Sequence, residues 1–220
     1  MNTHNSRTWL KTGFALLVFS LPWITVVPMA AGQSVELRPG YISGSLSVAG
    51  QTITSSSVSA YGSSGSANTS TSSGSYTLTV NVPQGQSATY TVSATSYFSG
   101  GGSLSFPSQT VGVSENATTT ANFSLNPGYI QGTVTTTSGT VSSLYLYASG
   151  GGGSSSRSFS GNSGTFPVVP GTVTVYGTAY FSGGGSASLG SQTVSVSAGG
   201  TAIVAWTVSP PPPTSQGTIT

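Results

Sequence analysis

Few residues of this 220-residue chain carry groups that could do chemistry. After residue 32, the ionisable side chains other than tyrosine are Glu36, Arg38, Glu115 and Arg157. A glycosidase needs two carboxylates placed across one sugar bond, and the two glutamates lie far apart in the sequence. The chain has no Asp or Cys, and its single His is His4. We therefore expect no catalytic residues, no metal site, no cofactor and no basic patch for nucleic acid, and we predict that the protein is not an enzyme.

Aromatic side chains offer a second kind of chemistry, the stacking of rings on sugars. The segment Tyr-Phe-Ser-Gly-Gly-Gly-Ser occurs twice, beginning at Tyr97 and at Tyr180. These two tyrosines could be stacking platforms, because the nearby glycines let a ligand approach the backbone. In the structural interpretation, which we favour, one ring of each pair enters a core, the other lies at the rim, and the glycines form the turn. Tyr145 and Tyr147, two residues apart on one face of a predicted strand, allow the same two interpretations.

The first 32 residues have the pattern of a secretory signal peptide. Arg7 and Lys11 form a positively charged start, residues 13–27 are apolar, and small residues suitable for cleavage follow. The apolar run is shorter than a membrane-spanning helix needs and contains Pro22, which argues against the alternative of a membrane anchor. Nothing later in the sequence is apolar enough to span a membrane. We therefore expect a secreted or cell-surface protein, and the lack of Cys fits a bacterial envelope.

An internal repeat divides the rest of the chain. Pro-Gly-Tyr-Ile at 39–42 returns at 127–130, and Ser-Gln-Thr-Val at 108–111 returns at 191–194. The predicted organisation is a signal peptide (1–32), repeat 1 (39–126), repeat 2 (127–209), a Pro-rich linker (210–216) and the start of a third repeat (217–220).

Alternating hydrophobicity predicts that both repeats consist of β-strands. Tyr76, Leu78 and Val80 alternate with threonines, a period of two that is typical of half-buried strands. No segment after residue 32 has helical spacing, and turn signals recur about every ten residues. We predict all-β sandwiches with seven strands in each repeat. The hydroxyl-rich segment 63–73 is expected to be a flexible loop, and in repeat 2 no strand is expected between residues 148 and 165.

Apolar and glycine positions recur in a fixed order along repeat 1. The order is Ile42-x-Gly44-x-Leu46, Val58-x-Ala60-Tyr61, Gly74-x-Tyr76-x-Leu78, Tyr90-x-Val92-x-Ala94 and Val111-x-Val113, closing on Phe123-x-Leu125. This pattern, which both repeats share, resembles the carboxypeptidase regulatory-like domain. The resemblance implies tandem transthyretin-like sandwiches, each with two sheets and seven antiparallel strands. The chain departs from the family in lacking its charged surface and the proline before the second strand. Other immunoglobulin-like sandwiches of bacterial surface proteins are the alternative.

Composition and repeats together predict a non-enzymatic, exported repeat protein that serves as a structural stalk, spacer or surface-display module. One alternative is a carbohydrate-binding or adhesion module that uses exposed Tyr97, Tyr145, Tyr147 and Tyr180 together with hydroxyl-rich loops. Another is a non-catalytic appendage of a larger secreted enzyme. The expected partners are polysaccharide or other cell-surface components. Near absence of charge repulsion also favours self-association.

We predict that the melting temperature varies by less than about 5 °C between about pH 5.5 and 9, and between low salt and about 0.5 M NaCl. Stability changes with pH only where the folded and unfolded chains bind different numbers of protons, and tyrosines ionise near pH 10. Charged residues are 3% of the chain, so salt has few charge pairs to screen. Thermal melts of residues 33–209 measure both dependences. A larger shift would show that interactions between charged groups contribute to the stability of the fold.

Overall fold

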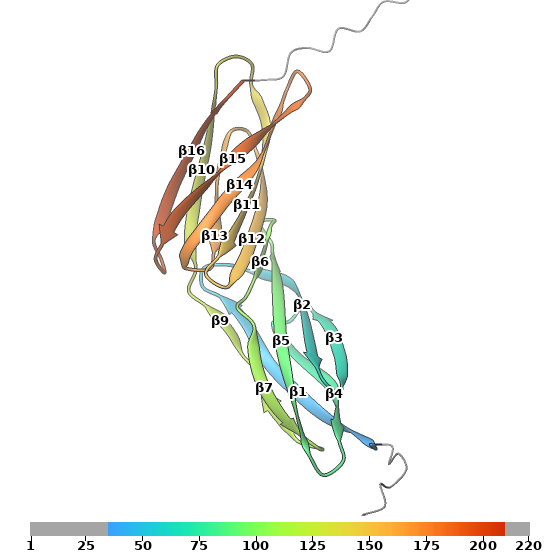
Figure 1. Ribbon diagram of the computed structural model, residues 1–220. Helices are drawn as coiled ribbons and strands as arrows, with labels where there is room; N and C mark the ends of the chain where they lie inside the picture. Colours follow the sequence, from blue (N-terminus) through green and yellow to red (C-terminus); the bar gives the residue numbers. More distant parts are fainter. Residues whose placement is uncertain (1–34, 210–220) are drawn as a thin grey trace, which may run out of the picture. The chain divides into compact units, whose positions relative to one another are not determined.

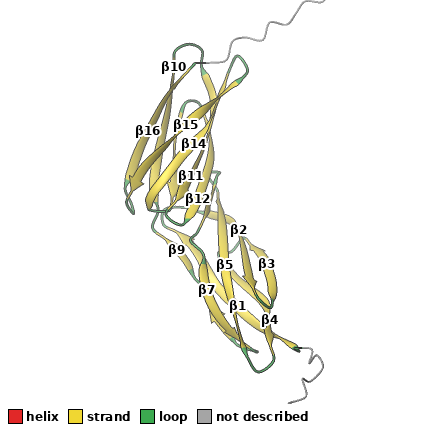
Figure 2. Cartoon of the chain, viewed as in Figure 1, coloured by secondary structure: helices red, strands yellow, loops and turns green. Residues whose placement is uncertain are grey.

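The computed structural model describes residues 35–209, which fold into β-strands and turns (Figure 1 and Figure 2). Sixteen strands and no helix are present in this range, so it contains no helix that could cross a membrane. The all-β prediction is confirmed. The predicted signal peptide at 1–32, linker at 210–216 and third repeat at 217–220 lie outside the described residues.

Repeat 1 contains strands β1 to β9, and repeat 2 contains strands β10 to β16. In repeat 1 the strands are β1 (Leu37–Val48), β2 (Ile53–Gly62), β3 (Gly65–Thr71), β4 (Ser75–Pro83), β5 (Ser87–Phe98), β6 (Ser103–Ser105), β7 (Gln109–Ser114), β8 (Thr118–Thr120) and β9 (Phe123–Leu125). In repeat 2 they are β10 (Gly128–Thr136), β11 (Val141–Gly150), β12 (Gly153–Ser160), β13 (Ser163–Val168), β14 (Gly171–Phe181), β15 (Ser186–Val196) and β16 (Thr201–Val208). Repeat 1 has the same seven strands as repeat 2 when β6 with β7, and β8 with β9, are each counted as one interrupted strand.

Alternating side chains build two hydrophobic cores. Along β4, Tyr76, Leu78 and Val80 are buried, while the threonines between them are exposed. The first core gathers buried residues of repeat 1, and the second core gathers buried residues of repeat 2. Val169, which follows β13, packs into the first core rather than the second. The limits of the two repeats stay predictions.

The strands form three sheets. One sheet of repeat 1 consists of β4, β1, β8 and β9, and one sheet of repeat 2 consists of β13, β10 and β16. The other layer of both repeats is a single nine-stranded sheet, termed here the long sheet, in the order β15-β14-β11-β12-β6-β5-β2-β3 with β7 also paired to β5. The long sheet is continuous because β6 of repeat 1 pairs with β12 of repeat 2.

The last strand of each repeat pairs in parallel with the first, a feature that the antiparallel prediction does not include. β16 pairs with β10 over eight residue pairs, from Tyr129↔Thr201 to Thr136↔Val208. β1 pairs in parallel with β8 and with β9, over three residue pairs each. Parallel neighbours need a long crossover connection, and in each repeat the intervening strands supply it.

Two hydroxyl-rich segments form strands that the sequence analysis misses. β3 lies within residues 63–73, which are predicted to be a flexible loop, and β12 lies between residues 148 and 165, where no strand is expected. Each pairs with a more apolar neighbour, β3 with β2 and β12 with β11. Backbone hydrogen bonding does not depend on side-chain hydrophobicity, and both strands bury few side chains. The prediction is wrong because apolar alternation detects only strands that contribute to a core.

The repeated Ser-Gln-Thr-Val segment has the same structural role in both repeats. Gln109 Nε2 donates a 2.6 Å hydrogen bond to the carbonyl oxygen of Asn122. Gln192 Nε2 donates a 2.7 Å hydrogen bond to the carbonyl oxygen of Ala205. Each bond connects the long sheet to the closing segment of the facing sheet. The motif therefore holds the two layers together at equivalent positions.

Candidate functional site

The two Tyr-Phe-Ser-Gly-Gly-Gly-Ser segments form matching hairpin turns, one from β5 to β6 and the other from β14 to β15. Gly101 N donates to Phe98 O at 2.9 Å, and Gly184 N donates to Phe181 O at 3.0 Å. The two glycines have φ values of 79° and 88°, which glycine adopts without strain. Both phenylalanines are buried in their cores. The structural interpretation thus accounts for the phenylalanine and glycine positions of the motif.

The tyrosines of the same motif lie on the outer face of the long sheet. Tyr97 and Tyr180 are 47% and 46% exposed. Residues that are paired across neighbouring strands share one face of a sheet. One row of paired residues runs from β5 across the junction to β14, through Tyr97, Ser103, Ser156, Tyr147 and Tyr176. The outer faces of both repeats therefore form one continuous surface.

Six tyrosines lie on this surface, which we term the tyrosine face. They are Tyr61, Tyr97, Tyr145, Tyr147, Tyr176 and Tyr180. All four predicted stacking residues are among them, so the structure brings to one face residues that come from three strands. Tyr61 and Tyr176 are missed by the sequence analysis. Each is out of phase with the buried residues of its strand, and this signal could have identified both.

Tyr147 and Tyr176 form an aromatic pair on the neighbouring strands β11 and β14. Their ring centroids are 4.9 Å apart and the ring planes are inclined by 40°. Tyr176 is 43% exposed, and Tyr145, two residues from Tyr147 on β11, is 38% exposed. Directly opposed side chains on neighbouring strands restrict one another. The two paired rings therefore present an apolar surface to solvent, and the exposed Tyr145 lies on the same face of β11.

Serine and threonine side chains fill the surface between the tyrosines. Hydroxyl pairs form across strands, with 2.8 Å between Thr95 Oγ1 and Ser105 Oγ and 3.2 Å between Thr174 Oγ1 and Thr193 Oγ1. Where β6 meets β12, an open depression of ≈ 530 Å³ lies beside Tyr147. Its hydroxyl-bearing lining residues are Ser93, Thr95, Ser105, Ser108, Ser149 and Ser154. The face thus combines aromatic rings with neutral hydrogen-bonding groups.

The charged side chains of residues 35–209 have partners elsewhere. Arg38 Nη2 lies 2.8 Å from Glu36 Oε1 in an ion pair at the start of β1. Glu115 Oε2 accepts a 2.9 Å hydrogen bond from a backbone N–H in the turn between β4 and β5. Arg157 Nη2 donates to a carbonyl in the turn between β5 and β6. Within the described range, no group of three or more His, Cys, Asp or Glu side chains is placed to hold a metal ion.

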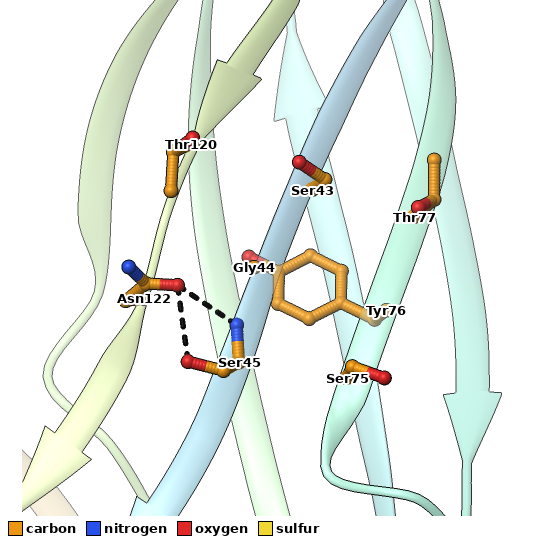
Figure 3. Close-up of a pocket in the computed structure, with 8 residues that line it drawn as sticks. All are labelled: Ser43, Gly44, Ser45, Ser75, Tyr76, Thr77, Thr120 and Asn122. Carbon is orange, nitrogen blue, oxygen red and sulfur yellow. Dashed lines mark hydrogen bonds between the residues drawn. The ribbon is translucent and has the colours of Figure 1, made fainter.

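A second open depression, of ≈ 540 Å³, lies on the sheet formed by β4, β1 and β8 (Figure 3). Asn122 Oδ1 accepts hydrogen bonds from Ser45 N at 2.9 Å and from Ser45 Oγ at 3.1 Å, drawn as dashed lines in Figure 3. These bonds bridge the gap between β8 and β9, where the closing strand is interrupted. Ser45, Asn122 and Tyr76 already have hydrogen-bond partners inside the protein, which gives these residues of the depression a structural role.

Gly44 is required at this gap because other groups occupy the space of a side chain. A Cβ on Gly44 would overlap the carbonyl oxygen of Ala121 and would lie 2.9 Å from Tyr76 Cε1. Figure 3 shows the ring of Tyr76 beside Gly44. The Tyr76 hydroxyl donates a 2.6 Å hydrogen bond to the Ala121 carbonyl oxygen. This bond supplies a partner to a carbonyl at the interruption of the strand.

We predict that Gly44→Ala lowers the free energy of unfolding by at least about 2 kcal/mol, because overpacking a tight contact costs about 1–3 kcal/mol or more. The matched control is Gly112→Ala in β7, where no heavy atom lies within 4 Å of the added Cβ. The control should stay within about 0.5 kcal/mol of the parent chain. Chemical denaturation measures both variants, and equal effects would contradict the packing role of Gly44.

Tyr76 makes this part of the fold sensitive to alkaline pH. Its side chain is buried, and burial raises the pKa of Tyr76 from 10.0 to about 12. The unfolded chain therefore loses this proton at a lower pH than the folded chain. The contribution of the neutral hydroxyl to stability is complete below about pH 10 and is lost as the pH rises through about 12. Burial also raises the pKa of Tyr90, which acts in the same direction.

We predict that stability falls between about pH 10 and 12, and that Tyr76→Phe makes this fall shallower. At neutral pH the same variant should lose about 1–3 kcal/mol, because the Ala121 carbonyl is left without its donor. Tyr41→Phe, on β1 of the same sheet, is the control for removal of a hydroxyl. Urea denaturation over a series of pH values gives both results. Parallel pH profiles for Tyr76→Phe and the parent chain would show that another group causes the fall.

Comparison with known proteins leaves the family of this chain open. No family model matches it, and no curated protein matches it. Among solved structures, a leucine-rich repeat protein from Bacteroides thetaiotaomicron VPI-5482 is 10% identical, with a TM-score of 0.28, over 77% of this chain and 26% of that protein. A proposed cell adhesion protein from Bacteroides ovatus ATCC 8483 is 12% identical, with a TM-score of 0.30, over 79% of this chain and 92% of that protein.

A proposed adhesin from Bacteroides ovatus ATCC 8483 is 7% identical, with a TM-score of 0.30, over 78% of this chain and 89% of that protein. This chain spans about a quarter of the length of the leucine-rich repeat protein. Likeness at these TM-scores carries no argument about function. The resemblance to the carboxypeptidase regulatory-like domain stays a prediction.

Proposed function

We propose that this protein is a non-enzymatic binding module whose tyrosine face holds an uncharged, extended polymer, with polysaccharide as the ligand class. The observation that carries the proposal is the gathering of six tyrosines on one face of the long sheet. Exposed apolar surface that is contiguous rather than scattered marks interaction sites on proteins. Tyr147, Tyr176 and Tyr145 supply such a surface.

The chemistry of the face suits sugars. A sugar ring presents an apolar C–H face and a rim of hydroxyls, which match an aromatic ring and its surrounding hydroxyl groups. The serines and threonines between the tyrosines can both donate and accept hydrogen bonds. The charged side chains of residues 35–209 are engaged elsewhere, so the face offers nothing to pair with a charged ligand.

The spacing of the tyrosines favours a polymer over a single sugar. Tyr97 on β5 and Tyr147 on β11 lie in one row and are separated by β6 and β12. Three strand spacings correspond to about 14 Å. A ligand that contacts both rings must therefore be extended, and it would pass over Ser103 and Ser156, with the depression beside it at Tyr147.

A second candidate function, a spacer or display stalk, is favoured by the junction itself. β6 and β12 join the repeats in one sheet, and Val169 of repeat 2 packs into the core of repeat 1. Such contacts restrict movement between the repeats. A spacer needs no ligand, so the two candidate functions differ in whether the tyrosine face binds anything.

We predict that the double variant Tyr147→Ala/Tyr176→Ala loses at least about tenfold in affinity for an insoluble or arrayed neutral polysaccharide, because truncated aromatic anchors typically cost more than about 1 kcal/mol each. Tyr41→Ala, on β1 of the sheet that packs against the inner face of the long sheet, should bind within about twofold of the parent chain. Pull-down on insoluble polysaccharides and a glycan array measure the affinities.

Circular dichroism and thermal melts establish that each variant is folded. Binding that survives the double variant would place the ligand elsewhere on the protein. If the parent chain binds no polysaccharide, the binding function fails and the spacer function is left as the explanation of the continuous sheet.

A further inference from the structure

The two repeats are joined edge to edge by a short antiparallel ladder. Ser103, Leu104 and Ser105 of β6 pair with Ser156, Ser155 and Ser154 of β12. Ser155 Oγ donates a 2.8 Å hydrogen bond to the carbonyl oxygen of Ser103. Arg157 Nη2 donates to the carbonyl oxygen of Gly100. One edge of repeat 1 is thus complementary to a different edge of repeat 2.

Each of these two edges has a counterpart in the other repeat. Neither counterpart pairs with a further strand within residues 35–209. β3 of repeat 1 pairs with β2 as β12 of repeat 2 pairs with β11. The start of β15, with Ser186 opposite Tyr180, matches β6, with Ser103 opposite Tyr97. β15 and β3 are the outermost strands of the long sheet.

Hydrogen-bond alternation identifies which backbone groups face outward at the free edges. The carbonyl oxygen of Gly102 accepts a hydrogen bond from Phe98 N, so the backbone N–H and C=O of Gly102 point toward β5. In an antiparallel ladder these groups alternate in direction along the strand, so those of the next residue, Ser103, point toward β12. Gly185 O accepts from Phe181 N in the same way. Ser186 and Ser188 of β15 therefore direct their N–H and C=O groups away from β14. By the same correspondence, Ser66 and Asn68 of β3 direct theirs away from β2.

We propose that the β15 edge of one molecule pairs with the β3 edge of a second copy of this chain. The pairing repeats the register of the internal junction, with Ser186 opposite Asn68 and Ser188 opposite Ser66. The two edges are different surfaces, so every assembly retains one free β15 edge and one free β3 edge, and the contact generates linear assemblies rather than closed dimers. Because the ladder continues the long sheet, the tyrosine face continues with it.

The pairing segments of the free edges lack the charged residues and prolines that usually prevent such pairing. Soluble proteins protect exposed strand edges with lysine, proline, inward-pointing charges or covering loops. The sequences Gly65–Thr71 and Ser186–Leu189 contain no charged residue and no proline. Both are instead rich in small hydroxyl side chains, which allow a second strand to approach.

The contact between molecules is weaker than the internal junction for identifiable reasons. At the position of Arg157 in β12, β3 has Thr69, and at the position of Ser155 it has Ala67. The hydrogen bonds that the side chains of Ser155 and Arg157 donate at the junction are therefore missing. The internal junction is also favoured by the short connection between the repeats, which gives an effective concentration in the millimolar range. We thus expect association at a chain concentration of about 1 mM.

Sedimentation equilibrium of the full chain tests the proposal. The average mass should rise with concentration toward about 1 mM. Ser188→Pro and Asn68→Pro each remove one outward N–H, and both should remain monomeric; proline is tolerated on edge strands. Ser188→Ala and Asn68→Ala keep the N–H and should associate like the parent chain. Thr69→Arg restores the arginine of the junction and should strengthen association about tenfold.

Mixing the two proline variants gives the sharpest result. Ser188→Pro retains the β3 edge and Asn68→Pro retains the β15 edge, so an equimolar mixture should form dimers and nothing larger. A parent chain that is monomeric at about 1 mM, proline variants that associate like the parent chain, or a mixture without dimers would each overturn the proposal. Tyr147→Ala/Tyr176→Ala should associate normally, which separates this proposal from ligand binding by the tyrosine face.

Discussion

The pairing of β6 with β12 is the interaction on which the rest of the arrangement depends. It consists of three residue pairs, yet it turns two separate outer layers into one sheet. Close approach is possible because Gly153 has no side chain: a Cβ there would overlap the carbonyl oxygen of Ser105. The continuity of the tyrosine face and the depression beside Tyr147 both follow from this ladder.

The parts of the fold that could be predicted from sequence are those with an apolar periodicity. Alternation along β4 identifies a half-buried strand, and the repeated Tyr-Phe-Ser-Gly-Gly-Gly-Ser segment indicates a buried ring beside a glycine turn. β3 and β12 could not be found in this way, since they are held by backbone pairing and bury few side chains. The tyrosine face was only partly predictable. Individual tyrosines were identified, but their common face depends on a junction ladder made entirely of small polar residues and one leucine.

Hydroxyl groups take over tasks that charged residues perform in most soluble proteins. Inside the first core, Ser56 and Ser96 place their hydroxyls 2.7 Å apart, so that each buried hydroxyl has a partner. On the surface, cross-strand pairs such as Thr174 with Thr193 replace ion pairs. Neutral hydrogen bonds of this kind are insensitive to salt and to moderate pH. A surface built from hydroxyl groups also lacks the charged edge residues that prevent sheets from pairing edge to edge.

The parallel pairing of first and last strands determines how each repeat responds to tension. β10 enters repeat 2 and β16 leaves it, and the two are parallel neighbours over eight residue pairs. A pull on both ends of the repeat acts along these strands, so the hydrogen bonds of the ladder are sheared together instead of opening one after another. In repeat 1 the corresponding ladder is divided into two parts of three pairs, bridged by Asn122 and Ser45. We therefore expect the divided ladder of repeat 1 to yield under a lower load than the continuous ladder of repeat 2.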